Sequence, residues 1–103
     1  MTGGELLDEC ATVEKAPEDL NDQQAIRQVN CLYYIQGVTE GLLLAGKNTG
    51  RFPTFCLPKD YNYLQMARII VKTLRERPES HHIQAVVLIP VIYNHFFPCN
   101  AKK

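Results

Sequence analysis

The sequence has neither an excess of positive charge nor an apolar run long enough to span a membrane. Its 11 lysines and arginines balance 11 aspartates and glutamates, so the formal net charge is zero. This removes the strongest argument for nucleic acid or an anionic membrane as partner. The longest apolar stretch, 83–93, is too short to span a bilayer and contains Gln84 and Pro90. We therefore expect neither a nucleic-acid-binding nor a membrane protein.

Side chains that could carry catalysis are also scarce. Ser80 is the only serine, and its place before an apolar run favours a role as a helix N-cap. His81, His82 and His95 form no pattern with a nucleophile, and there is no glycine-rich phosphate loop or HExxH motif. We expect no enzymatic activity, no cofactor and no metal.

The length of 103 residues corresponds to one domain over residues 1–103. Residues 1–4 lack the basic start and apolar run of a signal peptide, and we expect them to be either a disordered start or residues added to the natural chain. Acidic residues dominate 1–22, with a net charge of −6, and residues 23–103 carry +6. Either these parts lie against each other or in solvent, or the asymmetry orients a protein partner.

Apolar periodicity predicts four helices and no strands. The expected ranges are about 4–13, 21–46, 60–76 and 80–97. Asn21 followed by Gln24 predicts a capping box at the start of the second helix. The fourth helix is apolar on most faces, which suggests the central element of the domain. Gly37 and Gly41 share a face of the second helix, a placement typical of close helix packing. The predicted fold is all-α and four-helix bundle-like.

The four cysteines predict two disulfides. No pair has the short spacing of a zinc site, although free buried thiols in a cytosolic protein are an alternative. If consecutive helices run antiparallel, Cys56 and Cys99 meet at one end of the bundle, and Cys10 can then meet Cys31. Disulfides would indicate an oxidising compartment, so we expect a periplasmic mature chain whose leader has been removed.

A set of short motifs resembles the Tai/Rap immunity proteins. Residues 31–40, CLYYIQGVTE, are similar to the C-x-G-Y-I-x-G-V-x-D signature of that family, with Tyr33 in place of its usual Gly and Glu40 in place of Asp. Further similarities follow in order: Cys56-Leu57-Pro58, Gln65, Pro78-Glu79 and Phe97-Pro98-Cys99.

The resemblance implies an all-α homodimer that blocks the active site of a type VI secreted peptidoglycan amidase, a papain-like enzyme with a Cys-His pair. Protection of the producing cell then requires a rigid protrusion and flanking contacts, without chemistry from this chain. The alternative hypothesis is a small disulfide-bonded periplasmic acid-stress chaperone, which would depend on titrating groups such as the three histidines.

Three surfaces are candidates for contact with a toxin. One is the connection between the third and fourth helices, another is the loop at about 47–55, and the last is a basic stripe on the third helix. The candidate residues are Arg75, Arg77, Glu79, Ser80, His81 and His82 at the connection, Lys47, Arg51 and Phe52 in the loop, and Arg68 and Lys72 with Arg75 on the stripe. Basic and polar tips suit an electronegative partner.

Overall fold

Within the residues that the structure describes, the protein folds into four α-helices. The computed structural model describes residues 1–49 and 55–99, and the side chains of residues 47–49 lie outside that description. The helices are α1 (Gly3–Glu9), α2 (Asp22–Thr49), α3 (Tyr63–Glu76) and α4 (Ala85–Phe96), with short 3-10 helices η1 (Pro17–Asp19) and η2 (Pro78–Ser80). No strand occurs within the described ranges, and the predicted all-α class is confirmed.

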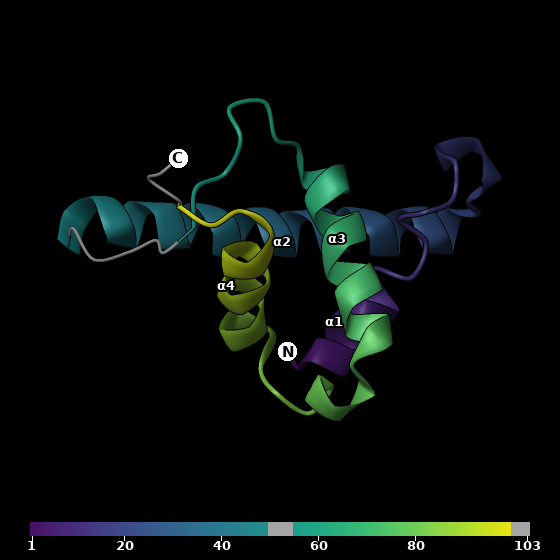
Figure 1. Ribbon diagram of the computed structural model, residues 1–103. Coiled ribbons are helices and arrows are strands. Elements are labelled where there is room, and N and C mark those ends of the chain that lie inside the picture. The colour runs from purple at the N-terminus through teal and green to yellow at the C-terminus, as the bar shows by residue number, and fades with distance from the viewer. Residues whose placement is uncertain (50–54, 100–103) are drawn as a thin grey trace.

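The long helix α2 forms one side of the domain. In Figure 1, α3 and α4 lie in front of α2 and cross its direction, and α1 lies near the end of α3 that leads into η2. The core forms where these helices meet. It consists of Leu6, Cys10, Val13, Cys31, Ile35, Phe55, Met66, Ala67, Ile70, Val71, Leu74, Ala85, Ile89, Ile92 and Tyr93.

Local side-chain caps explain where three helices begin. Asn21 accepts a hydrogen bond from the Gln24 backbone at 2.8 Å, and the Gln24 side chain accepts one from the Asn21 backbone at 3.0 Å. The predicted capping box is therefore confirmed. Thr2 and Glu5 form the same reciprocal pair at α1. The bond from the Thr2 backbone lowers the pKa of the Glu5 carboxyl. Asn62 caps α3 by accepting from the Gln65 backbone at 2.8 Å.

Both predicted disulfides are present. Cys10–Cys31 joins the C-terminal end of α1 to α2, and Cys56–Cys99 joins the segment before α3 to the segment after α4. The backbone also brings residues 55–56 beside residues 97–98, because Cys56 N donates to Phe97 O at 2.7 Å and Phe55 pairs with Pro98. In the chain-entropy view, bridges of this span stabilise a small domain by about 3–4 kcal/mol each.

The prediction that Ser80 begins the fourth helix is wrong. Helix α4 begins at Ala85, after Gln84, and Ser80 lies in η2, where its hydroxyl donates to Arg77 O at 2.8 Å. The reason is non-local. The carbonyls of His81 and Ile83 accept hydrogen bonds from the first residues of the chain, so this backbone is not available to a helix.

Helix α4 is not the central element that its composition suggested. Its Ile89, Ile92 and Tyr93 are buried, but Val87 and Val91 are more than half exposed. Tyr93 forms the polar centre of the core, sharing a 2.6 Å hydrogen bond with the buried Thr39 of α2. Burial raises the pKa of Tyr93 to about 12.

The lengths and hydropathies of the helices bear on membrane insertion. Within residues 1–49 and 55–99, no helix combines the length and the apolar character that crossing a bilayer requires.

Candidate functional site

The basic stripe of α3 is largely used within the chain. Arg68 Nε donates to Val13 O at 2.9 Å, and Arg75 Nη1 pairs with Glu14 Oε1 at 2.5 Å. Both contacts hold the segment that follows α1. Lys72 is exposed and has no ion pair or hydrogen bond within the described residues. The stripe therefore anchors the N-terminal acidic region, and Lys72 remains open to an external contact.

The acidic N-terminal region is held at a second point. Arg27 of α2 pairs with Glu9 at 3.4 Å, and Asn30 also donates to the Glu9 carboxylate at 3.1 Å. These contacts favour the interpretation in which the acidic and basic parts of the sequence lie against each other. Such exposed pairs contribute little stability individually, typically about 0–1 kcal/mol.

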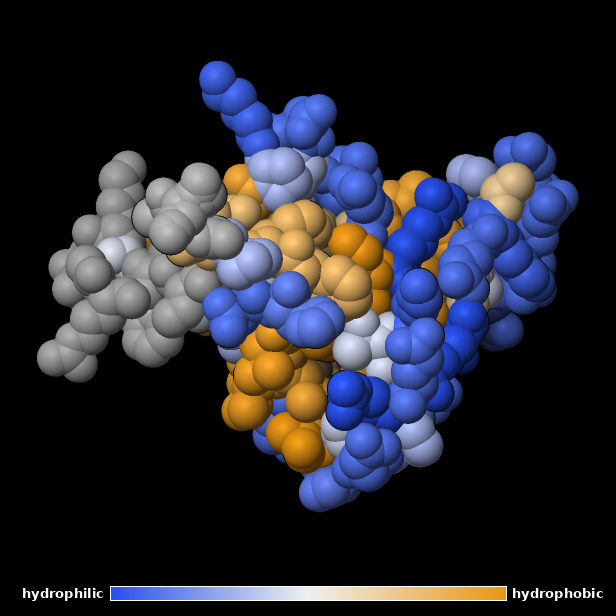
Figure 2. Space-filling view, viewed as in Figure 1, coloured by the Kyte–Doolittle hydropathy of each residue, from blue (hydrophilic) through white to orange (hydrophobic). Residues whose placement is uncertain are grey.

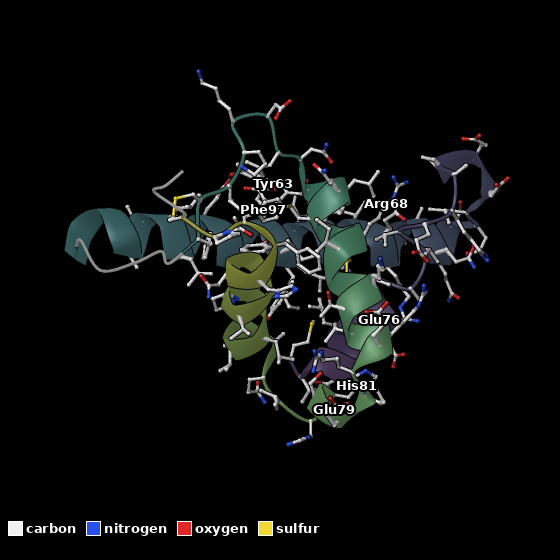
Figure 3. All side chains as sticks on the ribbon, in the orientation of Figure 1. Tyr63, Arg68, Glu76, Glu79, His81 and Phe97 are labelled. Carbon is white, nitrogen blue, oxygen red and sulfur yellow. A yellow bond between two sulfur atoms is a disulfide. The ribbon has the colours of Figure 1, made fainter. Side chains whose placement is uncertain are left out.

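The connection between α3 and α4 presents a polar tip at one end of the molecule. Arg77, Pro78, Glu79 and His82 are exposed there. The Arg77 and Glu79 side chains are 68% and 69% exposed and lie 3.8 Å apart, so both remain available to a partner. Figure 3 shows Glu79 at the outer edge of η2, below Glu76 at the end of α3.

Two other candidate residues of this connection have structural roles instead. The Ser80 hydroxyl bonds to Arg77 O, as described above. His81 Nε2 lies 2.6 Å from Leu74 O, and because a carbonyl only accepts, this nitrogen carries the proton. Leu74 O also accepts the capping bond from Arg77 N at 3.2 Å, so His81 adds a second hydrogen bond to a carbonyl at the end of α3. These contacts stiffen the tip from inside.

The first residues of the chain hold the same connection from the other side. Gly4 N donates to His81 O at 2.9 Å and Gly3 N donates to Ile83 O at 2.8 Å, while Ala85 N donates to Met1 O at 2.8 Å. A Cβ on Gly3 would lie 2.6 Å from a methyl carbon of Leu88. Residues 1–4 therefore differ from the disordered start that we expected, because they pair with residues 81–85.

A groove of about 380 Å³ lies directly beside this tip. Its walls come from the last turns of α3, from η2 and from α4. Both apolar and polar side chains line it. The lining residues are Thr73, Leu74, Glu76, Arg77, Ser80, Leu88, Val91, Ile92, His95 and Phe96. The groove adjoins the exposed apolar face of α4, where hydrophobic colour gathers in Figure 2.

The second candidate loop lies mostly outside the described residues. Arg51 and Phe52 fall within 50–54, and the side chain of Lys47 is likewise outside the description. The described end of this loop, Phe55, is buried against Tyr93 with ring centroids 5.1 Å apart. The role of this loop stays a prediction.

The structure thus brings together six of the candidate residues, from Arg75 to His82, and separates them from Arg68. Sequence reasoning missed the groove and the pairing of the N-terminus with this connection. One signal pointed to the groove: the fourth helix has more apolar side chains than one buried face can accommodate. Within the ranges 1–49 and 55–99, no three histidine, cysteine or acidic side chains gather as metal ligands would.

Comparison with known protein families places the chain beside a family of immunity proteins. The model of the Rap1a immunity proteins matches residues 2–99, which is nearly the whole chain. No curated protein and no solved structure matches.

Proposed function

This chain belongs to the Rap1a immunity protein family, and on that premise we propose that it acts in the periplasm as an inhibitor of a type VI secreted peptidoglycan amidase. The family match over residues 2–99 is the observation that carries the proposal, because an immunity protein implies a cognate toxin as its partner. Two disulfides support a location outside the cytoplasm, where they persist. We further propose that the chain acts as a homodimer.

The polar tip at η2 is the element that we propose enters the active-site cleft of the toxin. Arg77 and Glu79 project from it, while His81 and Ser80 hold its backbone. The N-terminal hydrogen bonds to His81 and Ile83 add a second restraint. A loop that is already ordered loses little conformational freedom on docking, and this favours affinity.

The groove beside the tip would supply specificity. Its apolar floor, with Leu88 and Ile92, and its polar rim, with Glu76 and His95, suit a projecting side chain of the toxin. Pockets of this kind near the centre of an interface are typical sites of binding hot spots. Val91 is an exposed member of the groove lining, and the exposed Lys72 of α3 would add a flanking contact.

Inhibition of a papain-like amidase requires no chemical step from this chain. A Cys-His enzyme needs its thiolate and imidazole to reach the substrate amide. A protein tip that fills the cleft excludes substrate and leaves the pair intact. The proposed function therefore requires only exposed contact residues and a stiff backbone.

The direct test is co-purification with a small Cys-His amidase encoded beside this gene. We expect a stoichiometric complex with nanomolar affinity by calorimetry, loss of amidase activity on peptidoglycan, and survival of cells that export both proteins. Absence of a complex together with absence of protection would refute the immunity function against an amidase.

The tip itself is tested by Arg77→Ala combined with Glu79→Arg. These side chains are exposed and form an ion pair with each other, so the circular dichroism spectrum should be unchanged. We expect a loss of affinity of ~30-fold or more, as for a central hot spot. The matched control is Glu18→Ala with Asp19→Arg in η1, which is also exposed. If both double variants bind the toxin as tightly as the wild type does, the toxin binds elsewhere.

A further inference from the structure

The outward side of α2 carries an apolar stripe that the described chain leaves open to solvent. Ile26, Tyr33 and Leu44 are 62%, 69% and 60% exposed, and Val29 is nearly half exposed. At 3.6 residues per turn, these positions lie on the side of the helix opposite the buried Ile35. Helices α3 and α4 both lie in front of α2 in Figure 1, on the buried side.

Two glycines occupy the same stripe. A Cβ on Gly37 or Gly41 would have no neighbouring atom within 4 Å. The close packing predicted for these glycines therefore does not occur against any helix within residues 1–49 and 55–99. Glycine destabilises an exposed helix interior relative to alanine, so their presence requires another reason.

The exposed side of α2 is also poor in charge. Between Gln23 and Gly46 the only charged residues are Arg27 and Glu40. Arg27 pairs with Glu9, and Glu40 accepts hydrogen bonds from Gln36 and from Tyr63. Depletion of charge combined with large apolar and aromatic side chains is the composition of an interface core.

The order of residues along the stripe is self-complementary. If a second α2 is laid antiparallel about a two-fold axis beside Ile35, every bulky residue faces a small or matching one. Tyr33 meets Gly37 of the second copy, Val29 meets its Gly41, and Ile26 meets its Leu44. Each pairing occurs twice, as an isologous two-fold interface requires. Glycine at two points lets the helix backbones approach closely enough for these side chains to pack.

We propose that α2 pairs antiparallel with α2 of a second copy of this chain through the stripe Ile26, Val29, Tyr33, Gly37, Gly41 and Leu44. A shallow hollow of about 230 Å³ lined by Ala25, Ile26, Val29 and Asn30 lies where Leu44 of the second copy arrives. The contact rests on the homodimer of the proposed function and gives it an interface. It uses the side of α2 opposite the core, and it involves no residue of the tip or groove.

The first measurement is sedimentation velocity of the isolated, oxidised protein at micromolar concentration. We expect twice the chain mass of 11.7 kDa. Tyr33→Lys and, separately, Gly37→Glu should each raise the dissociation constant of the dimer by ~30-fold or more. Neither change meets a neighbour within the monomer, since Tyr33 is largely exposed and Gly37 has open space. Circular dichroism should therefore be unchanged.

The antiparallel register is tested by mixing these two variants. In a heterodimer, position 33 of one copy faces position 37 of the other, so the new charges are opposite and attract. Each homodimer places like charges close together. We expect the mixture to recover the dimer that each variant alone has lost.

Val87→Lys on the exposed face of α4 is the matched control and should remain dimeric. A monomeric wild type, or a dimer that only Val87→Lys dissociates, would overturn the proposal. These outcomes are separable from failure of the immunity function, because they are measured without toxin. A monomeric Tyr33→Lys that still binds toxin would support the α2 interface and the separate tip together.

Discussion

The two faces of α2 have similar residues and different surroundings. The inner face contributes Cys31, Ile35 and Thr39, all fully buried. The outer face contributes Ile26, Tyr33 and Leu44, all mostly exposed. Both faces are apolar and repeat with helical spacing, so periodicity alone does not distinguish them. The comparison shows that the core of this domain is defined by which face receives α1, α3 and α4.

The two faces of α2 also differ in the contacts that their polar and small residues make. On the inner face, Thr39 is buried with its hydroxyl bonded to Tyr93, and Cys31 is covalently joined to Cys10. On the outer face, Gly37 and Gly41 meet nothing. The residues of the inner face therefore stabilise the folded domain, and those of the outer face are exposed and can contact a second molecule.

The largest difference should appear when an aliphatic side chain is truncated on each face. Ile35→Ala removes fully buried methylenes, and we expect it to lower the free energy of unfolding by about 2–5 kcal/mol. Ile26→Ala should change the stability of the monomer by less than about 0.5 kcal/mol. Urea denaturation at a concentration that keeps the protein monomeric measures both. Equal effects would contradict the assignment of the two faces.

The polar centre of the inner face should make stability depend on alkaline pH. The pKa of Tyr93 is raised by burial to about 12 from its ordinary value of 10. The neutral phenol is the form favoured by folding, so its contribution is complete below pH 10 and is lost as pH rises towards 12. We expect a loss of about 2–3 kcal/mol across this window.

Tyr93→Phe is the control for this pH dependence. It should lose stability at pH 7, because the Thr39 hydroxyl is left buried without its partner. The difference between wild type and Tyr93→Phe should shrink between pH 10 and pH 12. A constant difference would mean that Tyr93 does not titrate in this range.

On the outer face, a glycine replacement should act in opposite directions on folding and on association. Gly37→Ala should raise the stability of the monomer by about 0.5–1 kcal/mol, because it restricts the unfolded chain and meets no neighbour. The same change should weaken the dimer, since a methyl group enters the space for Tyr33 of the second copy. Thermal unfolding and sedimentation separate the two effects. If Gly37→Ala stabilises the monomer and also strengthens the dimer, Gly37 does not lie against Tyr33 of the second copy.

The smallest effect should come from the exposed ion pair that joins α3 to the acidic segment. Arg75→Ala should lower stability by less than about 1 kcal/mol, because Arg75 and Glu14 are each half exposed. The loss should decrease in high salt. A double-mutant cycle with Glu14→Ala measures the pair, and a coupling of several kcal/mol would mean that the segment is held more tightly than exposure suggests.

Local signals were predicted well. The capping box at Asn21 and Gln24 is formed by residues three apart, so it depends little on the rest of the chain. The buried residues Ala67, Ile70 and Leu74 of α3 have the helical spacing from which a helix was predicted at about 60–76. The disulfides were predicted because only one pairing matched the order of the helices. The basic stripe was predicted as a surface, but its contacts with Val13 and Glu14 were not.

Residues far apart in the sequence decided the rest. Ser80 has the residue type of an N-cap, yet its neighbours His81 and Ile83 bond to Gly4 and Gly3, across more than 75 positions of the chain. The exposed apolar face of α4 and the groove beside it arise for a related reason. Helix α4 packs at the edge of the domain. Its amino-acid composition does not show which of its faces the other helices cover.

The sequence by itself determined the helices, the cysteine pairs and the membership of an immunity protein family. These depend on residue type and spacing along one chain. Only the tertiary structure decided which face of α2 is core, which side chains of the connection are free, and that the first residues support it. Those outcomes depend on packing between distant segments, where burial removes water from one apolar face and leaves an equally apolar face exposed.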